Sequence, residues 1–192
     1  MKTAIIPARG GSKRIPSKNI KLFAGRPIIS YSINAARESG LFDRIIVSTD
    51  SADIAKVAVS CGAEIPFLRP AEISDDFTGT VPVLVHALKW LRENRSPAEH
   101  FCCIYPTAPF LTAELVRKGF ALLKEKDADT AFTVTSFPYP IMRALKIRDD
   151  GRVEMFWREH ENTRSNDLPA AYHDAGQLYW GRTESFLASG RL

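Results

Sequence analysis

TAIIPARGGSKR, residues 3–14, joins a short apolar run to a loop of glycine and basic residues. The run at residues 3–8 stops at glycines, as a buried strand of a parallel sheet does. Glycines let the backbone approach an anion and direct successive N–H groups at it, and arginine and lysine add positive charge. The stretch predicts a strand followed by a loop that binds phosphate groups. A flexible basic surface loop without a ligand is the alternative.

The loop belongs to a longer basic segment, residues 9–21, which contains no acidic residue. Its basic residues are Arg9, Lys13, Arg14, Lys18 and Lys21. A triphosphate carries about four negative charges and would complement them. Nucleic acid is disfavoured as a partner, because no aromatic residue lies among these positions and no nucleic-acid-binding motif is present. The segment matches neither the G-x-x-x-x-G-K-[ST] loop nor the G-x-G-x-x-G fingerprint.

Length and composition suit one globular domain, since the sequence has 192 residues and a net charge of +4. No apolar run approaches the ~20 residues that span a bilayer, so no membrane partner is expected. Cys102 and Cys103 lie within an apolar run, and Cys61 stands apart from them. We expect buried thiols in a reducing cytoplasm rather than a metal site.

Strand-like and helix-like segments alternate over the first 136 residues. After the first strand we expect helices at 27–39, 52–61, 80–93 and 111–124, and strands at 44–50, 64–68, 101–105 and 129–136. Gly40 is expected to follow the end of the first helix and Thr112 to cap the last. This alternation is typical of an α/β fold with a mostly parallel sheet and helices on both faces. Ligands bind such sheets at the edge where the strands end.

From residue 137 the pattern changes to short β-like runs at 142–148 and 152–157, and Asp150-Gly151 between them is a hairpin signal. Residues 171–180 indicate a further strand and 184–192 the beginning of a helix. We expect a single domain, 1–192, that has a nucleotide-binding α/β core at 1–136, a β-hairpin insertion at 137–170 and a returning strand and truncated helix at 171–192.

Several motifs in series resemble those of the acylneuraminate cytidylyltransferase family. They occupy residues 6–20, 25–29, 47–51, 67–72 and 105–110, in the order of the family. The resemblance covers most of residues 3–111 and implies a Rossmann-like nucleotidyltransferase fold. It also implies an enzyme that takes CTP and an α-keto acid sugar and releases pyrophosphate.

The same resemblance suggests which residues bind the nucleotide. They are Ala8, Arg9, Gly10, Gly11, Ser12, Lys13, Lys18, Asn19 and Arg69. Arg9 and Lys18 are expected to act in catalysis as well. Ser48, Thr49 and Asp50 end a strand near the expected pocket, although Asp50 is equally suited to capping the helix that follows, as Ser51 also is.

Residues 163–169 and 172–180 resemble the branch of the family that activates pseudaminic acid, a nine-carbon acidic sugar, although Asn166 stands where that branch usually has glutamine. The expected sugar-binding residues are Arg164, His173, Asp174 and Gln177, and Asp174 is expected to be catalytic too. An arginine suits the carboxylate of the sugar, because its planar fork can pair with both oxygens. For His173 and Asp174 a local turn or a strand-end pair is the alternative.

The resemblance implies Mg²⁺ held by an Asp-x-Asp motif beyond the strand at 171–180, and residues 181–192 contain no such motif. The metal ligands are therefore unknown. We expect the sequence to be a stretch of a longer protein, because residues 184–192 resemble the start of a helix. The other explanation is a natural short form that binds CTP or a CMP-sugar without fast catalysis.

Other acidic sugars would suit the same nucleotide-binding half, namely sialic acid, legionaminic acid and 3-deoxy-octulosonate. In relatives, the region that corresponds to 137–170 contacts a second subunit, so we expect a homodimer. Phe156 and Trp157 beside charged residues are compatible with such an interface, and equally with packing onto the sheet.

Overall fold

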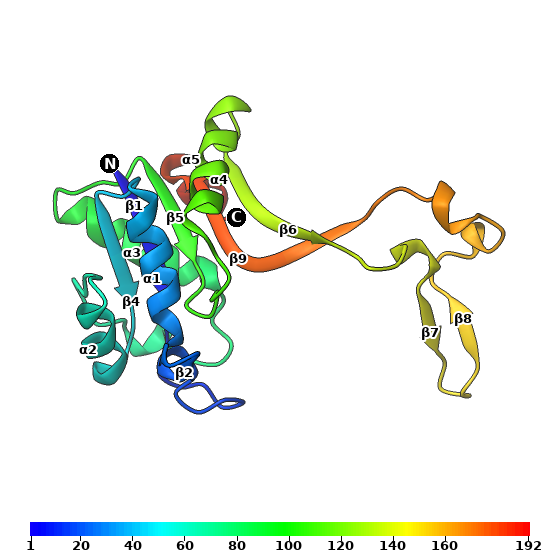
Figure 1. The fold of residues 1–192 in the computed structure, drawn as a ribbon, viewed down its shortest axis with the longest axis horizontal. Helices are drawn as coiled ribbons and strands as arrows, with labels where there is room; N and C mark the ends of the chain where they lie inside the picture. Colours follow the sequence, from blue (N-terminus) through cyan, green and yellow to red (C-terminus); the bar gives the residue numbers. More distant parts are fainter. The chain divides into compact units, whose positions relative to one another are not determined.

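Five strands form the main sheet, in the order β4-β1-β5-β9-β6 (Figure 1). The computed structural model describes all residues from 1 to 192. β1 pairs in parallel with β4 and β5, and β9 runs antiparallel to β5. The strands are β1 (Lys2–Pro7), β4 (Arg44–Ser48), β5 (His100–Ile104), β6 (Thr130–Ser136) and β9 (Tyr172–Arg182).

Helices connect the strands and cover the sheet. They are α1 (Ile28–Ser39), α2 (Ala52–Ser60), α3 (Thr80–Glu93), α4 (Ala113–Glu125) and α5 (Thr183–Ser189). The 3-10 turn η1 (Lys18–Ile20) and the two-stranded ribbon of β2 (Leu22–Phe23) and β3 (Arg26–Pro27) lie between β1 and α1 in the chain, and the 3-10 turn η2 (Ala71–Ile73) lies between α2 and α3. The predicted α/β architecture with a mostly parallel central sheet is confirmed.

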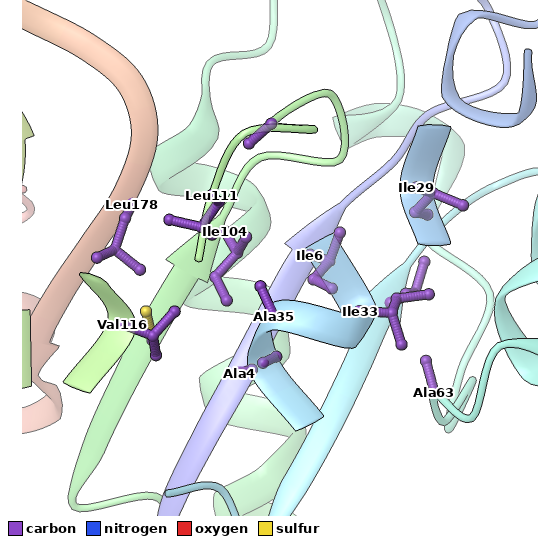
Figure 2. Packing of buried hydrophobic residues seen from close by; sticks show 14 of the residues in the cluster. Ala4, Ile6, Ile29, Ile33, Ala35, Ala63, Ile104, Leu111, Val116 and Leu178 are labelled. Atoms are coloured by element: carbon purple, nitrogen blue, oxygen red, sulfur yellow. The ribbon is translucent and has the colours of Figure 1, made fainter. Parts of the chain in front are cut away.

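Two hydrophobic clusters lie on opposite faces of the sheet. Side chains alternate along a strand, so Ala4 and Ile6 of β1 belong to one cluster and Ile5 to the other. The first cluster, shown in Figure 2, packs the sheet against α1, α2 and α4, and the second packs it against α3 and α5. Cys102 and Cys103 divide between the clusters in the same way, so both thiols are fully buried, and burial raises the pKa of each.

The predicted helix ends follow from local chemistry. Gly40 adopts φ 68° directly after α1, a left-handed conformation in which glycine has no steric cost. The hydroxyl of Thr112 accepts a hydrogen bond from the amide of Leu115 at 3.2 Å and caps α4. Both predictions are confirmed.

Two expected segments differ in the structure. No strand forms over 64–68, and Glu64 makes a single bridge to Ile46 instead. Pro66 has no N–H to donate, so a ladder cannot continue through it. Residues 184–192, expected as the start of a helix, contain nearly all of the short helix α5, which ends at Ser189 and is followed by Gly190 at φ 65°.

The chain divides into two compact units. The first comprises Met1–Thr133 with Gly176–Leu192, and the second comprises Val134–Ala175. Within the second unit, β7 (Leu145–Ile147) and β8 (Val153–Met155) form an antiparallel hairpin whose turn contains Gly151 at φ 78°. Three 3-10 turns complete it: η3 (Ile141–Arg143), η4 (Arg158–His160) and η5 (Ser165–Asp167).

Candidate functional site

A cavity of about 430 Å³ opens at the edge of the sheet where β1 and β5 end. The loop after β1 contributes Arg9, Ser12, Arg14, Lys18 and Asn19 to its lining. Arg69, Asp76, Thr80, Tyr105 and Thr107 line it from the segments around α3 and β5. The volume is in the range of small-molecule sites, and basic side chains outnumber acidic ones, so the cavity favours a small anion.

The loop after β1 is held by the segment after β4. Oδ1 of Asp50 accepts a hydrogen bond from the amide of Gly10 at 2.8 Å. A Cβ at Gly10 would lie 2.9 Å from Cβ of Ser51, so only glycine fits there without a shift. The cap of α2 is Ser51, whose hydroxyl accepts from the amide of Ile54 at 3.4 Å. Asp50 is thus not the helix cap, and it fixes the basic loop instead.

Asn19 holds the other end of the basic loop. Its Nδ2 donates to the backbone oxygen of Arg9 at 2.9 Å, and its side chain is almost fully buried. Oδ1 of Asn19 is buried without a hydrogen-bond partner, although Asn19 lines the cavity. A buried acceptor without a partner is costly, so this oxygen is suited to a donor on a ligand, such as a hydroxyl or amino group.

Arg69 is buried beside the end of β4. Its Nε donates to Oγ of Ser48 at 3.1 Å, and Nη2 donates to the backbone oxygen of Ser48. Burial lowers the pKa of Arg69 to about 10, while the negative charge of Asp50 raises it and the positive charge of Arg9 lowers it. Arg69 is therefore positively charged at neutral pH and contributes a fixed charge to the cavity.

The segment before α3 forms an acidic wall opposite the basic loop. Oδ1 of Asp76 accepts from Nη1 of Arg9 at 2.6 Å, and Oδ2 pairs with Nζ of Lys13. Oδ1 of Asp75 accepts from the amides of Phe77 at 3.0 Å and Thr78 at 2.6 Å, a turn that sets the course of the segment.

The predicted nucleotide-binding residues divide into two groups. Five of them, Arg9, Ser12, Lys18, Asn19 and Arg69, line the cavity. The other four, Ala8, Gly10, Gly11 and Lys13, are not part of its lining. The side chain of Ala8 is fully buried in the core, and its amide donates to the backbone oxygen of Ser48 at 2.9 Å.

The lining also includes residues that were not predicted as site residues, among them Arg14, Asp76, Thr80 and Tyr105. Arg14 was visible in the sequence as a member of the basic segment. Thr80 and Tyr105 are distant in the sequence, and the fold brings their hydroxyls to 3.0 Å from each other. No sequence motif contains both residues, so their proximity could not be predicted.

The predicted sugar-binding residues lie in both units. Gln177 belongs to β9 of the first unit, where its backbone oxygen accepts from the amide of Tyr105 at 2.9 Å. In the second unit, Nε of Arg164 donates to Oδ2 of Asp167 at 2.9 Å, and the Arg164 side chain is largely exposed. Nδ1 of His173 donates to the backbone oxygen of Asp174 at 2.9 Å, and its ring packs edge-on against Phe137. Arg164 is therefore accessible to a carboxylate, and His173 sits in a local contact.

The carboxylates near the cavity do not fit a resident magnesium site. Asp76 is bound on both oxygens by cations, and Asp50 is bound by the Gly10 amide. No group of three or more histidine, cysteine or acidic residues in the chain is arranged to hold a metal ion. Mg²⁺ usually needs carboxylates that are free to coordinate it, in addition to substrate phosphates. A requirement for Mg²⁺ stays a prediction of the resemblance.

Comparison with known proteins agrees with this geometry. Residues 3–189 match the family described as cytidylyltransferase. A pseudaminic acid cytidylyltransferase of Campylobacter jejuni is 42% identical over 183 residues, which are 95% of this chain and 79% of that protein. A CMP-N,N′-diacetyllegionaminic acid synthase of Legionella pneumophila is 38% identical over 121 residues, 63% of this chain and 52% of that protein.

The fold has a solved counterpart. The structure of a CMP:2-keto-3-deoxy-manno-octonic acid synthetase complexed with CTP superposes with a TM-score of 0.71 at 17% identity, over 98% of this chain and 77% of that chain. At this identity the likeness concerns the fold. None of the helices here is both long and apolar enough to cross a bilayer. The family match spans nearly the whole sequence, and the chain therefore belongs to the cytidylyltransferase family of nucleotidyltransferases.

Proposed function

We propose that this protein transfers CMP from CTP to the anomeric hydroxyl of pseudaminic acid and releases pyrophosphate. The observation that supports a nucleotide triphosphate as one substrate is the cavity at the end of β1, where Arg9, Lys18 and Arg69 supply positive charge. The identity of 42% to a pseudaminic acid cytidylyltransferase over 95% of the chain supports the choice of sugar.

The transfer makes one bond and breaks one bond. The anomeric oxygen of the sugar bonds to the α-phosphorus of CTP, and the bond from that phosphorus to the oxygen that bridges to the β-phosphate breaks. Pyrophosphate leaves with the bridging oxygen, and the hydroxyl proton passes to a base or to solvent. Negative charge grows on the departing pyrophosphate, so fixed cations beside it lower the barrier.

Arg9 and Lys18 are the residues proposed to carry that charge. Both line the cavity on the loop after β1, and Asn19 fixes the backbone of Arg9. The oxygen Oδ1 of Asn19, buried without a partner, is available to a hydroxyl of the ribose. Ser12 lines the cavity on the same loop, and its hydroxyl is proposed to donate to a phosphate.

On the sugar side, the proposed residues are Arg164 for the carboxylate, and His173, Asp174 and Gln177 for hydroxyl and acylamino groups. The support is chemical: the Arg164 guanidinium is largely exposed and pairs with a carboxylate, that of Asp167. Asp174 is also proposed to take part in catalysis. Mg²⁺ is kept as a proposed requirement without assigned ligands.

The deciding experiment measures pyrophosphate release with CTP, Mg²⁺ and pseudaminic acid. Release with CTP and little with UTP or ATP is the expected result. CTP binding without release in the presence of the sugar would favour the alternative, a module that binds CTP or a CMP-sugar without catalysis. Release that persists when Mg²⁺ is chelated would remove the metal requirement.

The choice of sugar has its own test. Sialic acid, legionaminic acid and 3-deoxy-octulosonate compete with pseudaminic acid in the same assay, and pseudaminic acid should have the highest kcat/KM. A preference for legionaminic acid would follow the likeness to the Legionella pneumophila synthase instead. A preference for any of the three would overturn the proposed sugar and leave the nucleotide chemistry in place.

We also propose a homodimer that forms through the second unit, in the cytoplasm. Apolar side chains on that unit are more than half exposed, among them Leu145, Ile147, Val153 and Phe156. An exposed apolar patch of this kind is typical of an interaction surface. Sedimentation should give a dimer, and Ile147→Lys should shift it towards a monomer. A wild-type monomer at working concentration would remove the dimer proposal.

A further inference from the structure

The carboxylate of Asp76 bridges two cations of the basic loop. Its Oδ1 accepts from Nη1 of Arg9 at 2.6 Å, and its Oδ2 pairs with Nζ of Lys13. Arg9 also donates to the backbone oxygen of Asp75 at 3.1 Å. The segment 74–79 is thus bound to the basic loop through Arg9, which lines the cavity, and through Lys13.

A carboxylate and a phosphate offer the same kind of group to these cations, an oxygen with negative charge. The hydrogen bond from Lys13 and then that from Arg9 lower the pKa of Asp76, so the carboxylate is ionised at neutral pH. A phosphate that pairs with Arg9 and Lys13 must therefore replace Asp76 or share the two cations with a second negative charge. Either way the carboxylate opposes the phosphate.

Other contacts hold the segment that carries Asp76. Oδ1 of Asp75 accepts from the amides of Phe77 and Thr78, and the hydroxyl of Thr80 lies 3.0 Å from that of Tyr105. These contacts do not involve the Asp76 side chain. A change at Asp76 therefore removes a negative charge from the cavity without dismantling its wall.

We propose that Asp76 is an internal competitor of the polyphosphate. Its carboxylate pairs with Arg9 and Lys13 and gives them up when CTP or pyrophosphate binds. This inference rests on the proposed function, because it takes the cavity as the site of CTP. The carboxylate lowers the affinity for CTP and for pyrophosphate together. By pairing again with the two cations it speeds the departure of pyrophosphate, so Asp76 favours turnover over tight binding.

The test compares Asp76→Asn and Asp76→Ala with the wild type in calorimetric binding of CTP, inorganic pyrophosphate and cytidine. Both variants should bind CTP and pyrophosphate about 3- to 10-fold more tightly, since each partly exposed ion pair is worth a modest amount. Cytidine has no phosphate, so its affinity should not change. Pyrophosphate should become a stronger product inhibitor of the variants in the same proportion.

Asp75→Asn is the matched control. It removes the same charge one residue away, while its side-chain oxygen can still accept from the amides of Phe77 and Thr78. Its CTP affinity should stay within about 2-fold of the wild type, because the Asp75 carboxylate makes no ion pair with the basic loop and exposed charges are screened by solvent and salt. A gain in Asp75→Asn equal to that in Asp76→Asn would show that net charge, not the bridge, sets the affinity, and would overturn the proposal.

Lys13→Met supplies a second, independent measurement. With one of the two cations gone, the gain in CTP affinity from Asp76→Asn should shrink, and an undiminished gain counts against the bridge. Weaker CTP binding in both Asp76 variants would mean that Asp76 aids the nucleotide, and this also overturns the inference. If the wild type binds neither CTP nor pyrophosphate, the proposed function itself fails. If it binds both and the Asp76 variants bind no more tightly, only this inference fails.

Discussion

The amide of Gly10 donates to Oδ1 of Asp50 at 2.8 Å, which ties the loop after β1 to the segment after β4. The two strands are neighbours in the parallel sheet, so their ends are brought together by the fold. The same glycine packs against Ser51 so closely that a Cβ would lie 2.9 Å from Cβ of Ser51. The course of the basic loop therefore depends on a hydrogen bond and on the absence of a side chain at one position.

Gly10→Ala should weaken CTP binding about 10-fold or more, because the added methyl group must push the loop away from Ser51 and displace Arg9. Gly11→Ala is the control, since the nearest atom to its Cβ is Nη1 of Arg9, 3.7 Å away, an ordinary contact. Neither glycine has a positive φ, so alanine can adopt the backbone conformation at both positions, and the two variants differ only in the space around the added Cβ. Calorimetric titration with CTP measures the difference, and equal affinities of the two variants would contradict the prediction.

Asp50→Ala should also weaken CTP binding about 10-fold, because the Gly10 amide loses a charged acceptor and the loop is released. Asp50→Asn keeps an oxygen at the same place and should remain within about 3-fold of the wild type. Asp53→Asn, on the exposed face of the first turn of α2, is the control for charge in this region. An Asp50→Asn variant as weak as Asp50→Ala would mean that the charge matters rather than the hydrogen bond.

The α/β core was predictable because its signals are local. The helix limits depend on residues such as Gly40 and Thr112, whose conformations or hydroxyls act within a few positions of the chain. The strand at 64–68 was the exception. There the apolar pattern indicated a strand, but Pro66 cannot donate to a ladder, so only Glu64 pairs.

The site was predictable where its residues are contiguous. Arg9, Lys18 and Asn19 stand on one loop, so their composition already indicated a phosphate. Asp76 is distant in the chain and opposite in charge, and nothing in its local sequence joins it to Arg9. Asp50 could not be assigned from residue types, because an acid after a strand suits a helix cap as well as a loop contact. The structure decides it, since the neighbouring Ser51 takes the cap.

Stability should fall as the pH drops below about 6.5, because the partly buried His86 and the buried His100 become protonated in the unfolded chain. Burial lowers the pKa of His86, the charge of Arg69 lowers it further, and Glu93 opposes both. Burial lowers the pKa of His100 as well. A histidine with a lower pKa in the folded state takes up protons more readily when unfolded. Acidification through the unfolded pKa therefore favours unfolding.

His86→Phe isolates the contribution of His86. Phenylalanine keeps the edge-on contact with Phe67, where the ring centroids are 4.7 Å apart, and removes a buried Nδ1 that has no partner. Urea unfolding between about pH 7.5 and pH 5.5 should show a smaller loss of unfolding free energy in the variant than in the wild type. His100 is present in the wild type and in the variant, so both proteins should still lose some unfolding free energy on acidification. Parallel losses in the two proteins would mean that His86 titrates alike in the folded and unfolded states.

Gly181→Ala should lower the free energy of unfolding by about 1–3 kcal/mol, and the melting temperature by about 2–4 °C for each kcal/mol. Gly181 of β9 is directly opposite Phe101 of β5, and a Cβ on it would lie 2.5 Å from Cζ of that ring. The ring cannot move away, because it is fully buried and packs against Phe186 at 4.8 Å between centroids. Calorimetric melting measures the change.

Two variants make this prediction specific to the ring. Gly79→Ala is the control, since nothing lies within 4 Å of its Cβ, and it should melt close to the wild type. Phe101→Leu removes the atoms that the new methyl group would strike, although it leaves a cavity of its own. The double variant Gly181→Ala/Phe101→Leu should therefore lose less stability than the sum of the two single losses. Strict additivity would place the cost of Gly181→Ala in the backbone of β9 and not in its contact with Phe101.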